Sequence, residues 1–296
     1  MAITLRHYKH PQDYKSISEF LINNYQTGNK DGNWVEPGWE YMHGHPYLQP
    51  QFLPRIGIWQ KGENIVAVVN FEEGLGDAFF QFKSGYRHLR TEMLDYAEAN
   101  LADNDGTLKA YIVDFDHEFI NLVKERGYQL TPHIKRPTAL FAVPNPFPEI
   151  VLPGGYRLQS IADQPDWAKV HQVMWRGFDH GEVPEITAED MEMRRKMFDT
   201  ITADLNLKIV VVAPNGDFVS ICGMFYQPEN HLAYVEPVAT DPEYRRMGLG
   251  KAAVLEGIRR CAERGAVEAI VGSDQLFYQA LGFEVKYYTR CWQKQV

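Results

Sequence analysis

The feature that most constrains the fold of this chain is an internal repeat. At an offset of 153 residues, segment 5–25 aligns without a gap on segment 158–178. At the same offset, RIGIWQKGENIVAVVNF aligns on KIVVVAPNGDFVSICGM. Chance similarity between short amphipathic elements rarely keeps one offset through two of them. We therefore interpret the chain as a tandem repeat of one structural unit.

Both copies predict the same order of elements. The first aligned segment has the pattern of a short strand, a turn with an aspartate at the helix N-cap (Asp13, Asp166) and an amphipathic helix. The second has the pattern of a β-hairpin, with turns at 61–64 and 214–217. Farther on, LVKERGYQL in the first copy echoes FYQALGFEV in the second. The shared plan is strand, helix, hairpin, strand, helix and strand.

A proline-rich segment separates the copies. VPNPFPEIVLPGG, residues 143–155, holds four prolines and is unsuited to a helix or a central strand. We therefore predict an N-terminal domain over 1–143, a linker over 144–155 and a C-terminal domain over 156–296. At 45% hydrophobic and 23% charged residues, the composition suits two packed cores.

Charge and composition exclude several classes of protein. A net charge of −9 argues against nucleic-acid binding, which needs a basic face. No apolar run approaches the roughly 18 residues that span a membrane, and the N-terminus lacks the apolar region of a secretion signal. Three widely spaced cysteines form no metal-ligand pattern. We expect a cytoplasmic protein that binds neither metal, membrane nor nucleic acid.

One stretch suggests phosphate binding. The strand pattern LAYVEPVAT (232–240), interrupted by Pro237, precedes DPEYRRMGLGKAA (241–253) and an amphipathic helix. Proline donates no ladder hydrogen bond, so it indicates a bulge or a place where the neighbouring strand has separated. Gly248 and Gly250 then allow a phosphate close to the N–H groups of the helix N-terminus. Arg245, Arg246 and Lys251 add positive charge.

Two other interpretations of this stretch were weighed. GLGKAA spells a form of the dinucleotide fingerprint G-x-G-x-x-A, and Asp274 follows at a suitable distance. However, seven residues separate the strand from Gly248, and only 46 residues follow Gly250, too few for the rest of a doubly wound sheet. The glycines could also serve only a tight turn.

The pattern VATDPEYRRMGLGKAAVLEG resembles the acyl-CoA-binding motif of the GNAT superfamily of N-acyltransferases, and FYQALGFEV resembles its closing motif. The resemblance covers the chain from about Tyr156 to the end. It implies two tandem GNAT-like domains of the α/β class. Each would have a mixed central sheet flanked by helices, and the C-terminal copy would have a V-shaped opening between central strands.

The resemblance also implies which residues bind acetyl-CoA. Main-chain groups of Val238, Ala239 and Thr240 would pair with pantetheine, and one N–H would polarise the thioester carbonyl. The following residues would hold the pyrophosphate: Arg245, Arg246, Met247, Gly248, Leu249, Gly250 and Lys251.

The family's reaction is direct attack of a neutral amine on the thioester. Glu236, beside Pro237, is the candidate base, acting through water. A salt-bridged strand glutamate is the structural alternative, and Tyr234 or water alone are alternative bases. Tyr278 is the candidate acid, a role that we favour over the core packing that its apolar neighbours also suggest. No Cys/His or Ser/His/Asp set suggests an acyl-enzyme.

The first copy lacks these groups. Alignment of YRHLRTEML on YRRMGLGKA replaces Gly248 by Arg90 and Gly250 by Glu92, and Tyr278 becomes Val123. Side chains at both positions would block a phosphate. We therefore predict that the N-terminal domain is structural or shapes the substrate site without catalysing the reaction.

Two segments lie where an acceptor would enter. The insert 28–52 contains aromatic residues that we considered as walls of a cleft between domains, and His43 and His45, for which a structural role is favoured over metal binding. The matching C-terminal segment is acidic and suits an ammonium or a solvated loop. The aromatic and acidic residues in question are Trp34, Trp39, Tyr41, Tyr47, Asp179, Glu182 and Glu185.

Together these patterns predict an acetyl-CoA-dependent N-acetyltransferase that acts on the amine of a small molecule. The alternative is a CoA-binding regulatory or scaffold protein without turnover. The sequence leaves open the acceptor, acetyl against longer acyl donors, and whether the protein forms a homodimer.

Overall fold

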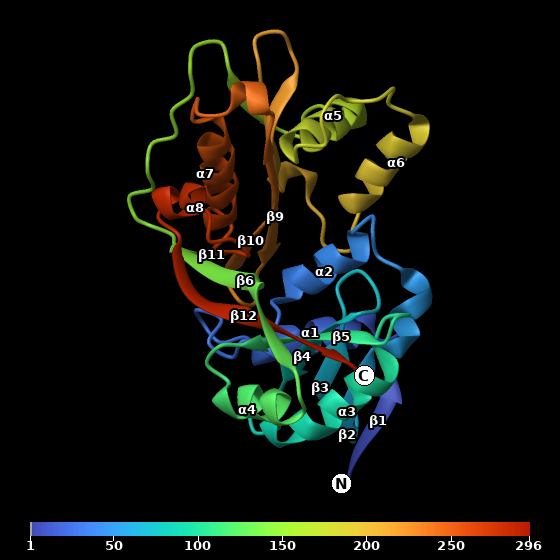
Figure 1. Cartoon of the computed structure of the whole chain (residues 1–296). Helices are drawn as coiled ribbons and strands as arrows, with labels where there is room; N and C mark the ends of the chain where they lie inside the picture. Colours follow the sequence, from blue (N-terminus) through green and yellow to red (C-terminus); the bar gives the residue numbers. More distant parts are fainter. Residues whose placement is uncertain (1) are drawn as a thin grey trace. The chain divides into compact units, whose positions relative to one another are not determined.

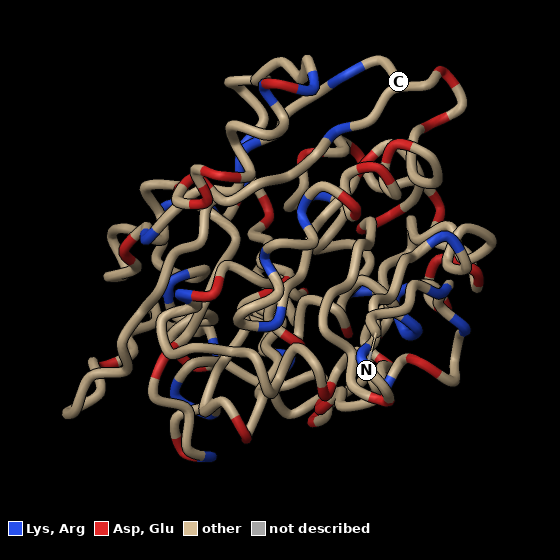
Figure 2. The backbone as a smooth tube through the Cα atoms, turned by 90° about the horizontal axis from the view of Figure 1, so that it is seen from below, with Lys and Arg blue, Asp and Glu red and all other residues tan. Residues whose placement is uncertain are grey.

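A computed structural model describes residues 2–296 (Figure 1). The chain divides into two compact units. Unit 1 comprises Met1–Ala139 with Val285–Val296, and unit 2 comprises Leu140–Glu284. Figure 2 shows that both signs of charge are distributed along the whole backbone. Among the described residues, no helix is long and apolar enough to cross a membrane.

Unit 1 is a mixed sheet with helices. Its strands follow the order β1-β2-β3-β4-β5-β12, with β6 next to β12. The pair β4 and β5 is parallel, and the other registered pairs in this unit are antiparallel. The elements are β1 (Ile3–His7), α1 (Tyr14–Asn24), α2 (Glu36–Gly44), β2 (Gly57–Lys61), β3 (Asn64–Asn70), β4 (Asp77–Phe82), α3 (Arg90–Asn100), β5 (Thr107–Val113), α4 (His117–Glu125), β6 (Gln129–Ala142) and β12 (Glu284–Gln295).

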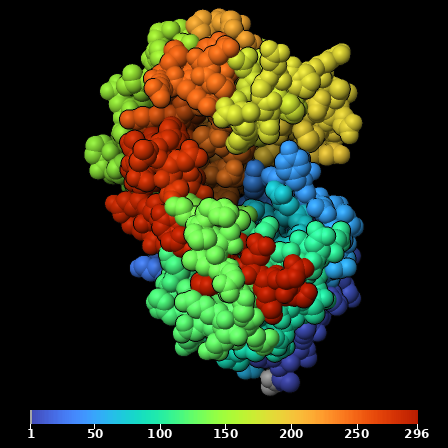
Figure 3. Space-filling view, in the orientation of Figure 1, coloured from blue at the N-terminus to red at the C-terminus, as the bar shows by residue number. Residues whose placement is uncertain are grey.

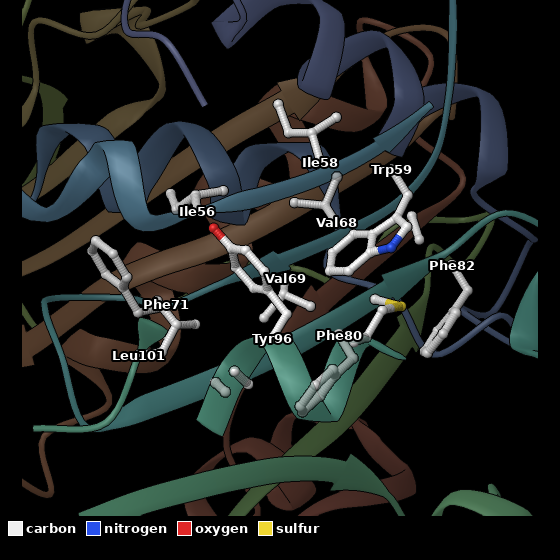
Figure 4. Packing of buried hydrophobic residues seen from close by; sticks show 14 of the residues in the cluster. Ile56, Ile58, Trp59, Val68, Val69, Phe71, Phe80, Phe82, Tyr96 and Leu101 are labelled. Carbon is white, nitrogen blue, oxygen red and sulfur yellow. The ribbon is translucent and has the colours of Figure 1, made fainter. Parts of the chain in front are cut away.

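The core of unit 1 forms where the apolar faces of β2, β3 and β4 meet α3 (Figure 4). Trp59 is fully buried, and its ring meets Tyr96 edge-on at 5.4 Å. The expected N-cap role of Asp13 is wrong in detail. Asp13 lies at the N-cap of α1, but its side chain accepts hydrogen bonds from Arg6 and the Lys9 N–H instead of capping the helix.

Unit 2 repeats the plan. Its strands follow the order β11-β10-β9-β8-β7, and the last residues of β6 adjoin β11. The pair β10 and β11 is parallel, and β7 to β10 are antiparallel. The elements are β7 (Arg157–Ser160), α5 (Trp167–Gly177), α6 (Ala188–Met197), β8 (Lys208–Val212), β9 (Phe218–Gln227), β10 (Leu232–Thr240), α7 (Leu249–Ala262), β11 (Glu268–Val271) and α8 (Leu276–Leu281).

Helices α5 and α7 cover opposite faces of the unit 2 sheet. A Cβ at Gly257 of α7 would meet Cys222, whereas a Cβ at Gly177 of α5 would meet Ala239, the partner of Ile221. Ile221 and Cys222 are neighbours in a strand, so their side chains point to opposite faces. The predicted α/β class with helix-flanked mixed sheets is confirmed.

The predicted local signals are also found. The hairpins β2–β3 and β8–β9 turn within 61–64 and 213–217. Asp166 caps α5 by accepting from the Lys169 N–H at 3.0 Å. The compact units differ from the predicted limits 1–143, 144–155 and 156–296 at the C-terminus. Residues 285–296 belong to unit 1 because β12 pairs with β5 over seven residues.

A bulge in β10 shapes unit 2. Val235 pairs with Met224 and Val238 pairs with Cys222, so Glu236 and Pro237 together oppose Gly223. A Cβ at Gly223 would lie inside van der Waals contact with Glu236 O and 2.7 Å from Pro237 Cδ. The bulge therefore requires glycine on the facing strand.

We predict that Gly223→Ala destabilises unit 2 by about 2–4 kcal/mol, because the new Cβ meets backbone that the bulge cannot move cheaply. Urea unfolding followed by circular dichroism measures this change. Gly154→Ala is the matched control, because nothing lies within 4 Å of a Cβ there. Equal stability of the two variants would show that the bulge does not need Gly223.

Candidate active site

Strand β10 loses its parallel neighbour halfway along its length. It pairs with β11 only over 232–234, although it continues to Thr240. On its other side, β10 stays paired with β9 as far as Thr240. Among residues 2–296, the edge of β10 beyond Tyr234 therefore pairs with no strand, which is the V-shaped opening that the resemblance implied.

Backbone alternation shows which groups face this opening. The Asp241 N–H donates to Val219 O at 3.0 Å, so Asp241 and Ala239 direct their backbone groups at β9. Val238 and Thr240 consequently direct theirs toward the opening. Thr240 O accepts from Arg245 Nε at 3.1 Å. The Val238 N–H and C=O and the Thr240 N–H thus form a strand edge available to an extended ligand.

A helix N-terminus follows this edge. We call residues 245–251 the cradle. Gly248 is the N-cap of α7 with φ 82°, and no side chain caps the helix. Within residues 2–296, no acceptor is found for the N–H groups of Leu249, Gly250 and Lys251. Uncapped N–H groups and the helix dipole make the cradle a binding site for an anion.

Gly250 brings the strand edge, the cradle and α8 together. A Cβ at Gly250 would lie 2.9 Å from Thr240 Oγ1 and 3.5 Å from the Phe277 ring, and only the absence of a side chain permits this approach. At Gly248, nothing lies within 4 Å of an added Cβ, so this position opens onto free space. A ligand on the cradle would therefore pass Gly248 and stay close to α8.

Tyr278 is buried beside this junction. Its ring contacts Phe277 and Phe283, with centroids at 4.9 and 5.6 Å. No residue of the described chain hydrogen bonds to its hydroxyl. Burial raises the pKa of Tyr278, and the charges of Cys222 and Glu236 act in the same direction. The hydroxyl therefore keeps its proton through the neutral range.

Glu236 is half-buried on the bulge, and it lies close enough for its charge to raise the pKa of Tyr278. Tyr234 is half-buried on the same strand, with its ring 6.2 Å from Phe225. The three cysteines are buried and unpaired by disulfides, and burial raises the pKa of the Cys222 thiol. None of them is placed as an exposed nucleophile.

The basic residues of the cradle differ in their surroundings. Arg246 and Lys251 are exposed, and no acidic partner of either is found among residues 2–296. The Arg245 guanidinium is instead bound by the protein, donating to Thr240 O, Gly177 O and Asp179 Oδ1. We expected it to add charge toward a phosphate, and its side chain is directed elsewhere.

The corresponding strand edge in unit 1 is occupied by the chain itself. β4 pairs with β5 only over 77–79 and continues to Phe82. The Asn33 amide donates to Phe82 O at 2.8 Å, and its Oδ1 accepts from the Phe82 N–H at 2.7 Å. Phe82 corresponds to Thr240 in the alignment of the two copies. Asn33 therefore pairs with the N–H whose counterpart unit 2 leaves open, and with the C=O whose counterpart, Thr240 O, accepts from Arg245.

The corresponding helix N-terminus in unit 1 is also neutralised. Arg90, at the position of Gly248, begins α3 and contacts Asp116 Oδ1 at 2.8 Å. Arg87, at the position of Arg245, reaches Asp116 Oδ2 at 2.5 Å. The Asp116 carboxylate is buried, so it supplies the negative charge inside the protein. Glu92, at the position of Gly250, accepts from Trp59 Nε1 at 2.7 Å.

The insert residues are partly built into the core of unit 1. Trp39 is buried against Tyr8 and His43, so it does not line an open surface. His43 Nδ1 donates to Trp39 O at 2.9 Å, and His43 Nε2 lies 3.2 Å from Tyr8 Oη. Burial lowers the pKa of His43 to about 4. Tyr47 is exposed. Asp179 pairs with Arg245, and Glu182 offers its carbonyl to Trp175 Nε1.

Several residues that shape the site were missed by sequence reasoning. Gly223 was detectable, because a glycine inside a strand pattern often marks a bulge. Asn33 carried no signal, since its role depends on a strand edge that only the fold creates. Arg176, at the end of α5, carried no signal either, and its contacts with Asp241 and Glu243, just before the cradle, are described below.

Residues 167–283 match the family model described as the acetyltransferase (GNAT) family. A mycothiol acetyltransferase from Kytococcus sedentarius is 34% identical over 149 residues, 46% of this chain and 48% of that protein. A glucosamine 6-phosphate N-acetyltransferase from Trypanosoma brucei brucei is 29% identical over 100 residues, 31% of this chain and 64% of that protein. The chain thus spans about half to two thirds of the length of these curated relatives.

The fold has counterparts along the whole chain. A solved structure titled as a tandem GNAT protein from the clavulanic acid biosynthesis pathway matches with a TM-score of 0.63, 13% identity and coverage of 99% of this chain and 98% of that one. This identity shows a shared fold alone. Residues 167–283 thus match the GNAT family of acetyltransferases, and the fold along the whole chain is similar to that of a tandem GNAT protein.

Proposed function

We propose that unit 2 transfers an acetyl group from acetyl-CoA to the amine of a small molecule. One observation carries the proposal: the open edge of β10 leads directly into the uncapped N-terminus of α7. An extended amide-bearing chain suits the strand edge, and a pyrophosphate suits the helix N-terminus. Pantetheine joined to a pyrophosphate has both parts in this order.

The proposed cofactor contacts follow from this geometry. Val238 and Thr240 would pair with the pantetheine amides, with Ala239 between them holding β10 to β9. The backbone of Arg246, Met247, Gly248, Leu249, Gly250 and Lys251 would surround the pyrophosphate. Exposed Arg246 and Lys251 would balance its charge.

The proposed reaction is one direct transfer. The amine nitrogen attacks the thioester carbon, the N–C bond forms and the C–S bond breaks. Glu236 takes the proton that the ammonium loses, through a water molecule, and the Tyr278 hydroxyl gives a proton to the departing sulfur. The Val238 N–H, directed into the opening, would stabilise charge on the carbonyl oxygen.

The acceptor class rests on the relatives and on charge. The names of both curated relatives refer to acetylation, one of them at an amino sugar. The net charge of −9 favours a cationic acceptor over a nucleic acid. Three free cysteines suit a reducing compartment, which we propose to be the cytoplasm. A homodimer stays a prediction.

Unit 1 is proposed to bind no acyl-CoA. Asn33 fills the strand edge, and Asp116 neutralises the arginines at the helix N-terminus. Val123 stands where unit 2 has Tyr278 and is fully buried. The unit would therefore serve as a structural partner or shape the acceptor site.

We predict that Gly248→Ala weakens CoA binding at least tenfold, because its Cβ projects into the open space at the cradle. Isothermal titration with CoA measures the change. Gly127→Ala is the matched control, since Gly127 has φ 85° and open space around its Cβ but lies in unit 1. Both variants carry about 1 kcal/mol of backbone strain. Equal affinity of the two would contradict the cradle assignment.

We predict that Tyr278→Phe and Glu236→Gln each lower kcat by about 10²-fold, because proton transfer by a positioned group contributes about that much. The KM for acetyl-CoA should stay within about threefold. Release of CoA thiol with a panel of small amines, including amino sugars, provides the assay. Tyr226→Phe is the control, since its hydroxyl binds only Arg264 O. Unchanged rates in both variants would remove these residues from the mechanism.

The same assay tests the pKa of Tyr278. Because burial raises this pKa, the hydroxyl stays protonated above the ordinary Tyr value of about 10. Between pH 8 and about 9.5, the rate of the unaltered protein should therefore not fall through ionisation of Tyr278. Any fall in this range should appear equally in Tyr278→Phe. CoA binding without turnover on any amine would favour the regulatory alternative.

We predict that Asn33→Leu lowers the stability of unit 1 by about 2–4 kcal/mol, because the Phe82 N–H and C=O lose their partners. Urea unfolding measures the loss, with exposed Asn104→Leu as the control. CoA should still bind at one site per chain, since Arg90 and Glu92 remain. A second CoA site in any variant that keeps Arg90 and Glu92 would contradict the assignment of unit 1.

A further inference from the structure

Two arginines join the cradle loop to the end of α5 in opposite directions. Arg176, in the last turn of α5, reaches forward to the loop, with Nε 2.8 Å from Asp241 Oδ2 and Nη2 2.7 Å from Glu243 Oε1. Arg245, in the loop, reaches back, with Nη2 2.9 Å from Gly177 O and 2.8 Å from Asp179 Oδ1. Each segment thus contributes one arginine, and each holds acceptors for the arginine of the other.

The helix end also touches the strand edge directly. A Cβ at Gly177 would lie 2.7 Å from Ala239 Cβ and 3.0 Å from Thr240 N, so only glycine allows this approach. Asp241 strengthens the junction, because its buried carboxylate also accepts from the Glu243 N–H at 3.0 Å. The strand edge, the loop and the end of α5 therefore form one connected piece.

The arrangement of these contacts indicates that Arg245 acts by holding the loop in position rather than through its charge. Arg245 divides its planar donors among Thr240 O, Gly177 O and Asp179, a set of acceptors that a lysine ammonium at the end of a flexible stem cannot reproduce. Exposed ion pairs contribute about 0–1 kcal/mol each, so overall stability is not their main effect. Their effect is to fix where the loop lies.

We propose that Arg245 and Arg176 are positioning residues that couple the cradle to α5, so that an anion bound on the cradle orders the segment 178–197. This inference rests on the proposed function of the cradle. The segment contains Asp179, the partner of Arg245, close to its start and continues to the end of α6. It is yellow in Figure 3 and lies at the surface. By linkage, order in this segment strengthens anion binding in turn.

Little of the segment is buried, although α6 packs against α5 and Glu182 O accepts from Trp175 Nε1. In α6 only Arg194 and Met197 are buried. A helix with so small a buried face opens at low free-energy cost, so a contact at its upstream end changes its order measurably. The acids that were considered for an ammonium, Glu182 and Glu185, lie in the same segment. Coupling would thus order the acceptor side after acetyl-CoA has bound.

The first test compares Arg245→Lys with Arg245→Gln by titration with CoA at several salt concentrations. If Arg245 positions the loop, both variants raise the Kd by about fivefold or more, and the salt dependence of log Kd stays that of the unaltered protein. If the guanidinium instead contacts a phosphate, Lys preserves affinity while Gln loses both affinity and salt dependence. That second pattern would overturn the proposal.

The second test is hydrogen exchange with and without CoA. In the unaltered chain, CoA should slow exchange over 241–253 and over 178–197. In both Arg245 variants at saturating CoA, protection over 241–253 should persist and protection over 178–197 should disappear. Arg264→Gln is the control, since it removes an ion pair with Asp204 in unit 2 that does not touch the loop.

The outcomes separate the two proposals. Protection of 178–197 that persists in the Arg245 variants overturns the coupling and leaves the cradle intact. Failure of the unaltered chain to bind CoA overturns the proposed function itself, and the coupling with it. Loss of protection in Arg264→Gln as well would show a general effect of destabilisation and would also overturn the coupling.

Discussion

The active site depends on one interruption of a hydrogen-bond ladder. Glu236 and Pro237 occupy two positions on β10 opposite the single Gly223 on β9. The pairing of β10 with β11 ends at Tyr234, just before the bulge, and from there to Thr240 this edge of β10 pairs with no strand among residues 2–296. In a sheet, an unpaired edge is normally a liability. Here it is directed at the N-terminus of α7, so the same unpaired groups become a place for an extended ligand.

In unit 1 the chain itself fills the corresponding opening. Its β4 leaves β5 in the same way, but Asn33 pairs with the exposed backbone and the Asp116 carboxylate neutralises Arg87 and Arg90. The Asn33 amide makes the hydrogen bonds that a neighbouring strand would make, and the Asp116 carboxylate supplies negative charge as a phosphate would. The two units therefore present the same backbone requirements, one satisfied from within and one left to a ligand.

The sequence predicted the fold of the two copies well, and its assignment of backbone groups to the site stays a prediction. The repeat, the hairpins, the bounds of β10 and the opening beyond Pro237 all follow from patterns of glycine, proline and apolar residues. Side-chain partners were harder. Arg245 reads as a phosphate ligand because charge near glycines suggests one, yet Gly177 and Asp179, 66 or more residues earlier, take its donors. Asn33 was invisible because its partner is a strand edge 49 residues away.

The proton transfers proposed for unit 2 follow from burial in the same way. Tyr278 lies among Phe277 and Phe283, and this surrounding raises the pKa that makes it a donor rather than a base. Glu236 is half-buried on the bulge. The bulge and the open edge beside it thus place the Glu236 carboxylate and the Val238 N–H on one short stretch of β10. The binding and the chemistry proposed for unit 2 therefore share this stretch of backbone, so a change at Gly223 should affect both together.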